Sequence, residues 1–299
     1  MVRKMGLPCL RLAFAVLTTG VAWLPSEGAA EAVSMENEGL TLVGNLERAA
    51  DWPQGPTLLI THGTLSHKDS EIIQTLQTLF LEAGTSSLAI NLSLGIDRRQ
   101  GSFDCSLEHT HRHGDATAEL DAWLRWLERA GATHVVPLGH SRGANQTAWF
   151  TAHSNSPLIV AQVLVAPPAA SVTRNLPQLT EARQLADRDE GKTTLRLERF
   201  LYCENATVTA ATLLSYYDTP DSLDTRIALR QTTTPTLIFV GSDDDTTPGL
   251  EEAYADLAMS SPVEMVVIDG ADHFFRDLFA DELVEATLEF LERVRPPTD

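Results

Sequence analysis

The sequence predicts an α/β fold, in which a mostly parallel central sheet is covered by helices on both faces. One observation predicts this fold, and a second predicts an insertion within it. Short, fully apolar runs alternate with amphipathic segments of helical period along most of the 299 residues, a rhythm typical of parallel strands connected by helices. The rhythm breaks once, over about 171–233, where helix-forming and polar residues predict an inserted helical lid. The expected organisation is therefore one α/β domain at 31–299 that carries this insertion.

Composition and charge exclude several classes of protein. The chain is 43% hydrophobic and 21% charged, ordinary values for a globular protein with a sizeable core. Its net charge of −19 at pH 7 would repel a phosphate backbone, and no basic run offsets that charge. We therefore expect no nucleic acid as partner. A small-molecule substrate is expected to be neutral, or to have its anionic group held by a local cation.

The first 30 residues are typical of a secretory signal peptide. Arg3, Lys4 and Arg11 lie before or at the start of an apolar run at 12–24, and small residues follow at 28–30. The apolar run is too short to cross a bilayer comfortably. The sequence predicts cleavage of 1–30, export to the periplasm or the exterior, and no stable membrane span afterwards. An uncleaved anchor is the alternative.

The elements before the insertion follow in order. Residues 40–46 alternate weakly and predict an opening antiparallel strand, and 57–61 predict the first buried strand. Helical spacing of apolar residues predicts a helix at 72–80, and a further strand follows at 87–92. After a polar stretch, a helix begins near Asp115. Its apolar face comprises Leu120, Trp123, Leu124 and Leu127.

The later elements resume the same alternation. Functional groups gather beyond the carboxyl ends of the strands in a parallel sheet, so the loops that follow these strands are where we expect the site. The predicted strands lie at 135–138, 158–165, 235–241 and 263–268, and the predicted helices lie around 250–257 and through 283–291.

The motif with the clearest chemistry is Gly139-His140-Ser141-Arg142-Gly143, a G-x-S-x-G turn between an apolar strand and a helix that begins with small and polar residues. Such a turn is sterically tight, so a side chain at either glycine would strike the neighbouring strand or helix. It places the serine in a strained backbone conformation and exposes its hydroxyl at the edge of the sheet. Ser141 is therefore the candidate nucleophile.

A serine hydroxyl needs a base, and the base needs an orienting carboxylate. The loop after 235–241 offers Asp243, Asp244 and Asp245, and the loop after 263–268 offers His273. The order along the chain is thus serine, aspartate, histidine, which is the order of the α/β-hydrolase topology. On the residues alone, each of the three aspartates is a candidate.

Over roughly 57–291, these motifs resemble those of α/β-hydrolase-fold serine hydrolases, of the lid-bearing type seen in serine aminopeptidases and monoglyceride lipases. In that family the acid lies three residues after the glycine that ends its strand, and a proline follows four residues later. The resemblance therefore implies Asp244 as the acid, with Pro248 in the matching position, and His273 as the base.

The resemblance also implies an oxyanion hole, two backbone N–H groups that stabilise the negative charge of the reaction intermediate. One is the N–H after the nucleophile, on Arg142. His62-Gly63-Thr64 resembles the His-Gly motif of the family, so Thr64 supplies the second N–H, with Leu65 as the alternative donor. His62 is expected to fix this loop by hydrogen bonding. No cofactor is implied.

The function expected from these residues is hydrolysis of a carboxylic ester or thioester. Ser141 attacks the acyl carbonyl with His273 as general base and Asp244 orienting it, and water then releases the acyl-enzyme. The triad fits two alternatives equally well, a peptidase and an acyltransferase. A third alternative is a non-catalytic protein on a hydrolase scaffold, with or without a bound metal.

Three further residues are candidates for substrate contacts. Leu65 lies in the loop after 57–61, and His140 precedes the nucleophile, where a structural role is the alternative. Tyr216 is one of three tyrosines in the predicted lid, and it either lines a substrate pocket or packs between lid helices.

The polar loop between 95 and 114 contains alternate histidines, His109, His111 and His113. In an extended chain they share one face, and their side chains are ligand types for zinc or copper. Their spacing matches no closed structural site, so we predict no metal. Loss of the signal peptide leaves only Cys105 and Cys203, which form either one disulfide or two free thiols.

Overall fold

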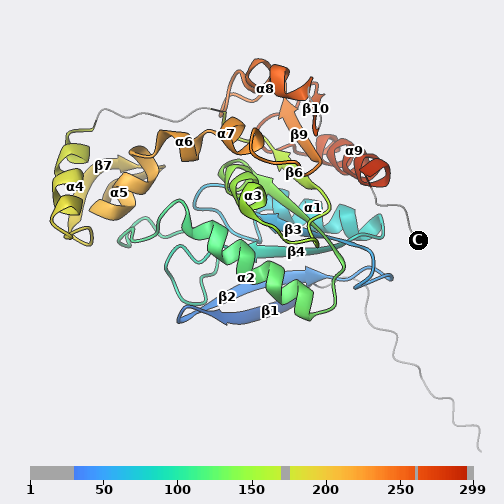
Figure 1. Ribbon diagram of the computed structural model, residues 1–299, viewed down its shortest axis with the longest axis horizontal. Helices are drawn as coiled ribbons and strands as arrows, with labels where there is room; N and C mark the ends of the chain where they lie inside the picture. Colours follow the sequence, from blue (N-terminus) through green and yellow to red (C-terminus); the bar gives the residue numbers. More distant parts are fainter. Residues whose placement is uncertain (1–29, 170–175, 260–261, 295–299) are drawn as a thin grey trace, which may run out of the picture.

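The computed structural model describes residues 30–169, 176–259 and 262–294. All but the last residue of the expected signal peptide thus lies outside the described residues. The central sheet has eight strands in the order β1-β2-β4-β3-β5-β6-β9-β10 (Figure 1). Pairing is antiparallel between β1 and β2 and between β2 and β4, and parallel everywhere else in this sheet. The strands are β1 (Glu31–Asn37), β2 (Leu40–Glu47), β3 (Pro56–Thr61), β4 (Ser86–Asn91), β5 (His134–His140), β6 (Gln162–Val165), β9 (Thr236–Gly241) and β10 (Val263–Ile268).

Helices cover both faces of the sheet, as the apolar runs predict. Along β3, Leu59 packs in the apolar cluster that contains the buried face of α2. Its neighbours Leu58 and Ile60 point to the opposite face and pack in the cluster with α1 and α9. The helices are α1 (Glu71–Glu82), α2 (Asp115–Arg129), α3 (Arg142–His153), α8 (Leu250–Ala258) and α9 (Leu278–Val294).

The insertion between β6 and β9 is not entirely helical, and in this respect the sequence prediction is wrong. It contains an antiparallel hairpin of β7 (Thr194–Phe200) and β8 (Cys203–Thr209). Leu195 and Leu197 are buried while Arg196 and Glu198 are exposed, the two-residue period of a strand. The charged residues conceal that period in the sequence. The helices of the insertion are α4 (Pro177–Asp187), α5 (Ala210–Tyr217), α6 (Pro220–Leu223) and α7 (Thr225–Leu229).

The insertion has an apolar core of its own, built from α4, the hairpin and α5. Two residues of the main domain, Leu65 and Phe103, join that core. The loop between β4 and α2 also pairs with the hairpin, since His109 and Val208 form a parallel bridge. Figure 1 shows α4, β7 and α5 at one end of the molecule, beside this loop. The insertion is therefore anchored to the loops that follow β3 and β4.

Two strands differ from their predicted extent. β1 is an additional antiparallel edge strand, whose exposed and charged residues give no apolar signal. β6 begins only at Gln162, because Ile159 makes an isolated bridge with Val135 instead of continuing the ladder. In the described part of the chain, no helix is both long enough and apolar enough to cross a membrane.

Candidate active site

Ser141 lies at the sharp turn between β5 and α3, with φ 55° and ψ −125°. A positive φ is strained for a residue with a side chain. The turn is possible because both flanking glycines lack a Cβ. A Cβ on Gly139 would lie 2.4 Å from the carbonyl oxygen of Gly143, and one on Gly143 would lie 2.3 Å from that of His62. These contacts are the steric conflicts expected from the sequence.

The structure brings the serine, the histidine and one aspartate together, although they lie in three separate loops. The Oγ of Ser141 is 2.9 Å from Nε2 of His273. On the other side of the ring, Nδ1 of His273 is 2.7 Å from Oδ2 of Asp244. Both His273 and Asp244 are buried. A buried carboxylate on Nδ1 leaves Nε2 free to accept the serine proton, which is the arrangement that activates a serine nucleophile.

Asp244 is held by a second set of donors. The N–H groups of Thr246 and Thr247 both donate to its Oδ1 at 2.8 Å, and the hydroxyl of Thr247 donates to Oδ2 at 2.7 Å. Burial by itself raises the pKa of this carboxyl, but the hydrogen bonds from His273 and Thr247 outweigh burial and hold the pKa at about 2. Asp244 is therefore ionised throughout the neutral range.

Sequence reasoning did not identify Thr247 as part of the site. The signal for it is local, since an aspartate often accepts hydrogen bonds from backbone N–H groups two or three residues further along. Of the three candidate aspartates, Asp243 and Asp245 are both exposed.

His140 holds the loop of His273 in place. Its Nε2 donates to the carbonyl oxygen of His273 at 2.8 Å. Burial, followed by the nearby His273, lowers the pKa of His140 to about 4, so the ring is neutral at pH 7. His140 also lines the cavity described below, and its contact with a substrate stays a prediction.

The two predicted oxyanion donors lie next to the serine. Arg142 is the first residue of α3, where a backbone N–H has no partner within the helix. Thr64 lines the same cavity, and its hydroxyl accepts a hydrogen bond from Nε of Arg142 at 3.1 Å. Leu65 differs from its prediction as a substrate contact. It does not line this cavity and is buried in the core of the insertion, because its φ of 52° turns the chain there.

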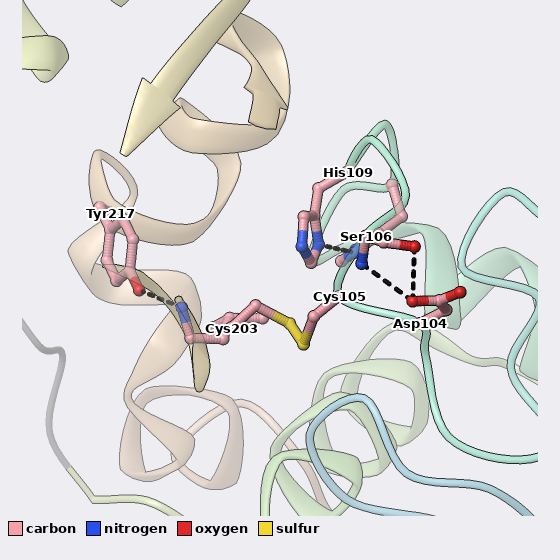
Figure 2. The surroundings of a disulfide bond; sticks show 8 residues. Asp104, Cys105, Ser106, His109, Cys203 and Tyr217 are labelled. Carbon is pink, nitrogen blue, oxygen red and sulfur yellow. Dashed lines mark hydrogen bonds between the residues drawn. A yellow bond between two sulfur atoms is a disulfide. The ribbon is translucent and has the colours of Figure 1, made fainter. Parts of the chain in front are cut away.

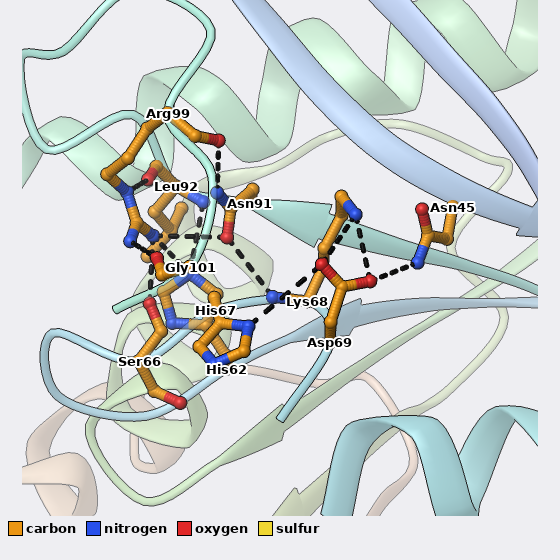
Figure 3. A network of polar contacts seen from close by, with 10 residues as sticks. All are labelled: Asn45, His62, Ser66, His67, Lys68, Asp69, Asn91, Leu92, Arg99 and Gly101. Carbon is orange, nitrogen blue, oxygen red and sulfur yellow. Dashed lines mark hydrogen bonds and ion pairs between the residues drawn. The ribbon is translucent and has the colours of Figure 1, made fainter. Parts of the chain in front are cut away.

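His62 fixes the loop after β3 through the network that Figure 3 shows. Its Nε2 accepts from the N–H of Leu92 at 3.1 Å and lies 3.0 Å from the guanidinium of Arg99. Burial, together with the charge of Arg99, lowers the pKa of His62 to about 3. His62 is therefore a structural residue. Arg99 also donates to three backbone carbonyls of the neighbouring loops, those of Ser66, Leu92 and Gly101.

A cavity of about 500 Å³ opens beside Ser141. Its size suits a small molecule, and its lining includes Ser141, His273 and Arg142. The insertion supplies one wall, on which the buried Tyr216 lies. The lining residues that the insertion provides are Leu201, Tyr202, Tyr216, Tyr217 and Leu223.

His109, His111 and His113 are buried while the residues between them are exposed, so they share one face of an extended segment. Each ring has a nitrogen that is hydrogen-bonded to another of these histidines or to a side chain of a neighbouring element. His109 Nδ1 lies 3.1 Å from His111 Nε2, and His111 Nδ1 lies 2.9 Å from the hydroxyl of Tyr216. His113 Nε2 is bonded to Asn145 Oδ1 at 2.8 Å. Within the described residues, no group of histidine, cysteine and acidic side chains is arranged to hold a metal ion.

Cys105 and Cys203 form a disulfide (Figure 2). Cys105 comes from the loop between β4 and α2, and Cys203 begins β8. The Cα atoms are 5.3 Å apart, although 98 positions separate the residues in the sequence. The bond therefore ties the insertion covalently to the loop that carries the histidines.

Comparison with known proteins assigns the family. Residues 58–286 match the model of the alpha/beta hydrolase family. The chain belongs to that family. The match runs from β3 into α9 and confirms the fold class predicted from the sequence. No curated protein sequence matches the chain.

Several solved structures resemble this alpha/beta hydrolase in fold. Est1E from Butyrivibrio proteoclasticus, also solved with ferulic acid bound, is 16% identical with a TM-score of 0.61, covering 88% of this chain and 98% of its own. GrgF from Penicillium sp. sh18 is 19% identical with a TM-score of 0.66, covering 88% and 98%. An esterase from Pyrococcus furiosus is 18% identical with a TM-score of 0.59, covering 89% and 91%. At such identities the similarity extends to the fold alone.

Proposed function

We propose that this alpha/beta hydrolase is a serine hydrolase that cleaves a carboxylic ester or thioester. The observation that carries the proposal is the hydrogen-bonded series from Ser141 Oγ through His273 to Asp244, with distances of 2.9 and 2.7 Å. A non-catalytic scaffold would have no need of this alignment, nor of a strained serine beside a cavity. Esterases among the structural neighbours add support.

The proposed reaction has two stages. Ser141 Oγ attacks the acyl carbon while its proton passes to Nε2 of His273, and the N–H groups of Thr64 and Arg142 stabilise the oxyanion. His273 then gives that proton to the departing alcohol or thiol, which leaves an acyl ester on Ser141. In the second stage a water molecule loses a proton to His273 and attacks the acyl carbon. A carboxylic acid departs and Ser141 recovers its proton.

We further propose that the protein is exported and that the insertion acts as a lid over the substrate. Export is supported by the N-terminal sequence and by the disulfide, since disulfides persist in oxidising compartments. The lid is supported by the tyrosines and leucines with which the insertion lines the cavity. Export is tested on protein isolated from its native compartment. We expect its N-terminal sequence to begin after the signal peptide and a thiol titration to find no free cysteine.

The central test compares the mature protein with Ser141→Ala. Both react with a fluorophosphonate probe and are assayed on p-nitrophenyl esters of increasing chain length. We expect labelling and turnover in the wild type and neither in the variant, with a loss of about 10⁴-fold or more in kcat/KM. Ser102→Ala, at an exposed serine, is the matched control and should label like the wild type. Absence of labelling in folded wild-type protein would refute the serine mechanism.

A further inference from the structure

Charged side chains line the cavity in two distinct places. At its exposed mouth lie Glu71, Arg276 and Asp277. There the guanidinium of Arg276 is paired with Glu71 at 3.6 Å and with Asp272, four residues before it in the sequence. Its charge is therefore compensated by the protein. The second place is beside the nucleophile, where Arg142 lies.

Arg142 is a cation without a counter-charge. Among the residues that the structure describes, no carboxylate lies within ion-pair distance of it. Its contacts are with neutral groups, because Nε donates to Thr64 Oγ1 at 3.1 Å and the guanidinium lies 5.3 Å from the ring centroid of Tyr216. No hydrogen bond joins its two terminal nitrogens to any described residue. Arg142 lines the cavity, and these two nitrogens keep donor capacity that no described residue uses.

This arrangement needs an explanation, because a partly buried charge without a partner is costly. Burial lowers the pKa of Arg142, which reflects that cost. Counter-charges are abundant elsewhere in this chain, with 41 acidic residues against 22 basic ones, and yet none is described beside this guanidinium. An arginine that is held by a hydroxyl at Nε and by an aromatic ring, and whose two terminal nitrogens have no partner in the described part of the chain, is suited to bind a carboxylate.

We propose that Arg142 binds a carboxylate of the substrate, so that the enzyme prefers esters or thioesters that carry an anionic group near the scissile carbonyl. This inference rests on the proposed function and narrows its substrate class. A strongly acidic protein can accept an anionic substrate in this way, because the guanidinium of Arg142 attracts the carboxylate within the cavity. The carboxylate belongs either to the acyl part or to the leaving group, and the experiment separates these two cases.

The test uses two pairs of esters in which methylation of a free carboxylate removes its charge. On the acyl side, p-nitrophenyl hemiglutarate is compared with its methyl ester. On the leaving-group side, 4-acetoxybenzoate is compared with methyl 4-acetoxybenzoate. We expect the wild type to prefer the anionic member of one pair, and Arg142→Gln to reduce that ratio of kcat/KM by about thirtyfold or more. The ratio is the readout, because effects on the chemical step act on both members of a pair.

Two further variants make the result specific. Arg129→Gln removes one positive charge from an exposed position at the end of α2 and should keep the wild-type ratio. Arg142→Lys keeps the charge but loses the planar fork, and it should retain part of the preference. Fluorophosphonate labelling of each variant shows that Ser141 is still assembled.

The possible failures are distinguishable. If the wild type hydrolyses the neutral esters with no preference for either anionic partner, Arg142 does not bind a substrate carboxylate, although the serine mechanism stands. If Arg142→Gln is labelled by the probe and keeps the wild-type ratio of kcat/KM between anionic and neutral esters, Arg142 likewise does not bind a substrate carboxylate. If the wild type neither labels nor hydrolyses any ester, the proposed function itself is wrong.

Discussion

Asp244 accepts a hydrogen bond from Nδ1 of His273 at 2.7 Å, and both side chains are almost fully buried. The aspartates on either side of it in the sequence, Asp243 and Asp245, are exposed. Three adjacent carboxylates thus occupy two very different environments. Only the central one has the geometry to orient the imidazole.

This difference gives a matched pair of variants. Asp244→Asn should lower kcat by about 10⁴-fold, because an amide no longer stabilises the imidazolium or the correct tautomer of His273. Asp243→Asn removes the same charge one residue away and should stay within about threefold of wild type, since exposed charges contribute little. Steady-state kinetics on one ester would measure both. Equal losses in the two variants would contradict the assignment of Asp244.

The residues that we propose for the chemistry could be predicted because each follows a strand end. The G-x-S-x-G turn between a strand and a helix makes Ser141 a candidate nucleophile, and the loops after β9 and β10 offer the other two groups. The sequence could not choose among three aspartates without the family resemblance, because the choice depends on which carboxylate the turn buries. The hydrogen bonds from Thr246 and Thr247 make that choice.

The insertion was the least predictable part of the fold. Its hairpin is amphipathic with charged outer residues, so no fully apolar run marks it, and its strands pair with each other rather than with the main sheet. The environment of Arg142 is also not predictable from the sequence. The residues that surround it, Thr64 and Tyr216, come from segments far apart in the chain.

Buried histidines should make the protein unstable in acid. Burial is the first cause that lowers the pKa of each of five rings, to about 3 or 4. In the folded state these rings stay neutral at pH values where the unfolded chain, with histidine pKa near 6.5, is protonated. Their stabilisation is present above about pH 6.5 and is lost as pH falls toward the folded-state pKa values. The five are His62, His109, His111, His113 and His140.

The free energy of unfolding, measured by urea denaturation between pH 8 and pH 4.5, tests this expectation. Each histidine that stays neutral contributes a decrease of about 1.4 kcal/mol per pH unit below pH 6.5. Several acting together should unfold the protein before pH 4. A free energy of unfolding that stays constant from pH 7 to pH 4.5 would show that the rings become protonated without unfolding.

Glu119 should have the opposite pH dependence. It is 7% exposed and accepts hydrogen bonds from the N–H and the hydroxyl of Ser93. Burial raises its pKa to about 7, and the bonds from Ser93 offset only part of that rise. Because the folded-state pKa is raised, the associated stability is full below about pH 4.5 and is lost as pH rises through 7.

Glu119→Gln isolates this effect, because glutamine resembles the protonated acid and does not titrate. Relative to wild type, the variant should gain stability as pH increases from 5 to 8.5, by at most about 3 kcal/mol for a shift of this size. The difference between the two unfolding curves is the measurement, so the histidine contributions cancel. A difference that does not change with pH would mean that Glu119 titrates normally in the folded protein.

The disulfide between Cys105 and Cys203 should contribute strongly to stability, because it closes a long loop. With a sequence separation of 98 between the cysteines, the loss of chain entropy in the unfolded state corresponds to about 2–5 kcal/mol. The double variant Cys105→Ser with Cys203→Ser should be destabilised by that amount at equilibrium. A reductant should lower the wild-type midpoint toward that of the variant and leave the variant unchanged. If the oxidised wild type contains two titratable thiols, or if reductant affects both proteins equally, the bond does not stabilise the fold.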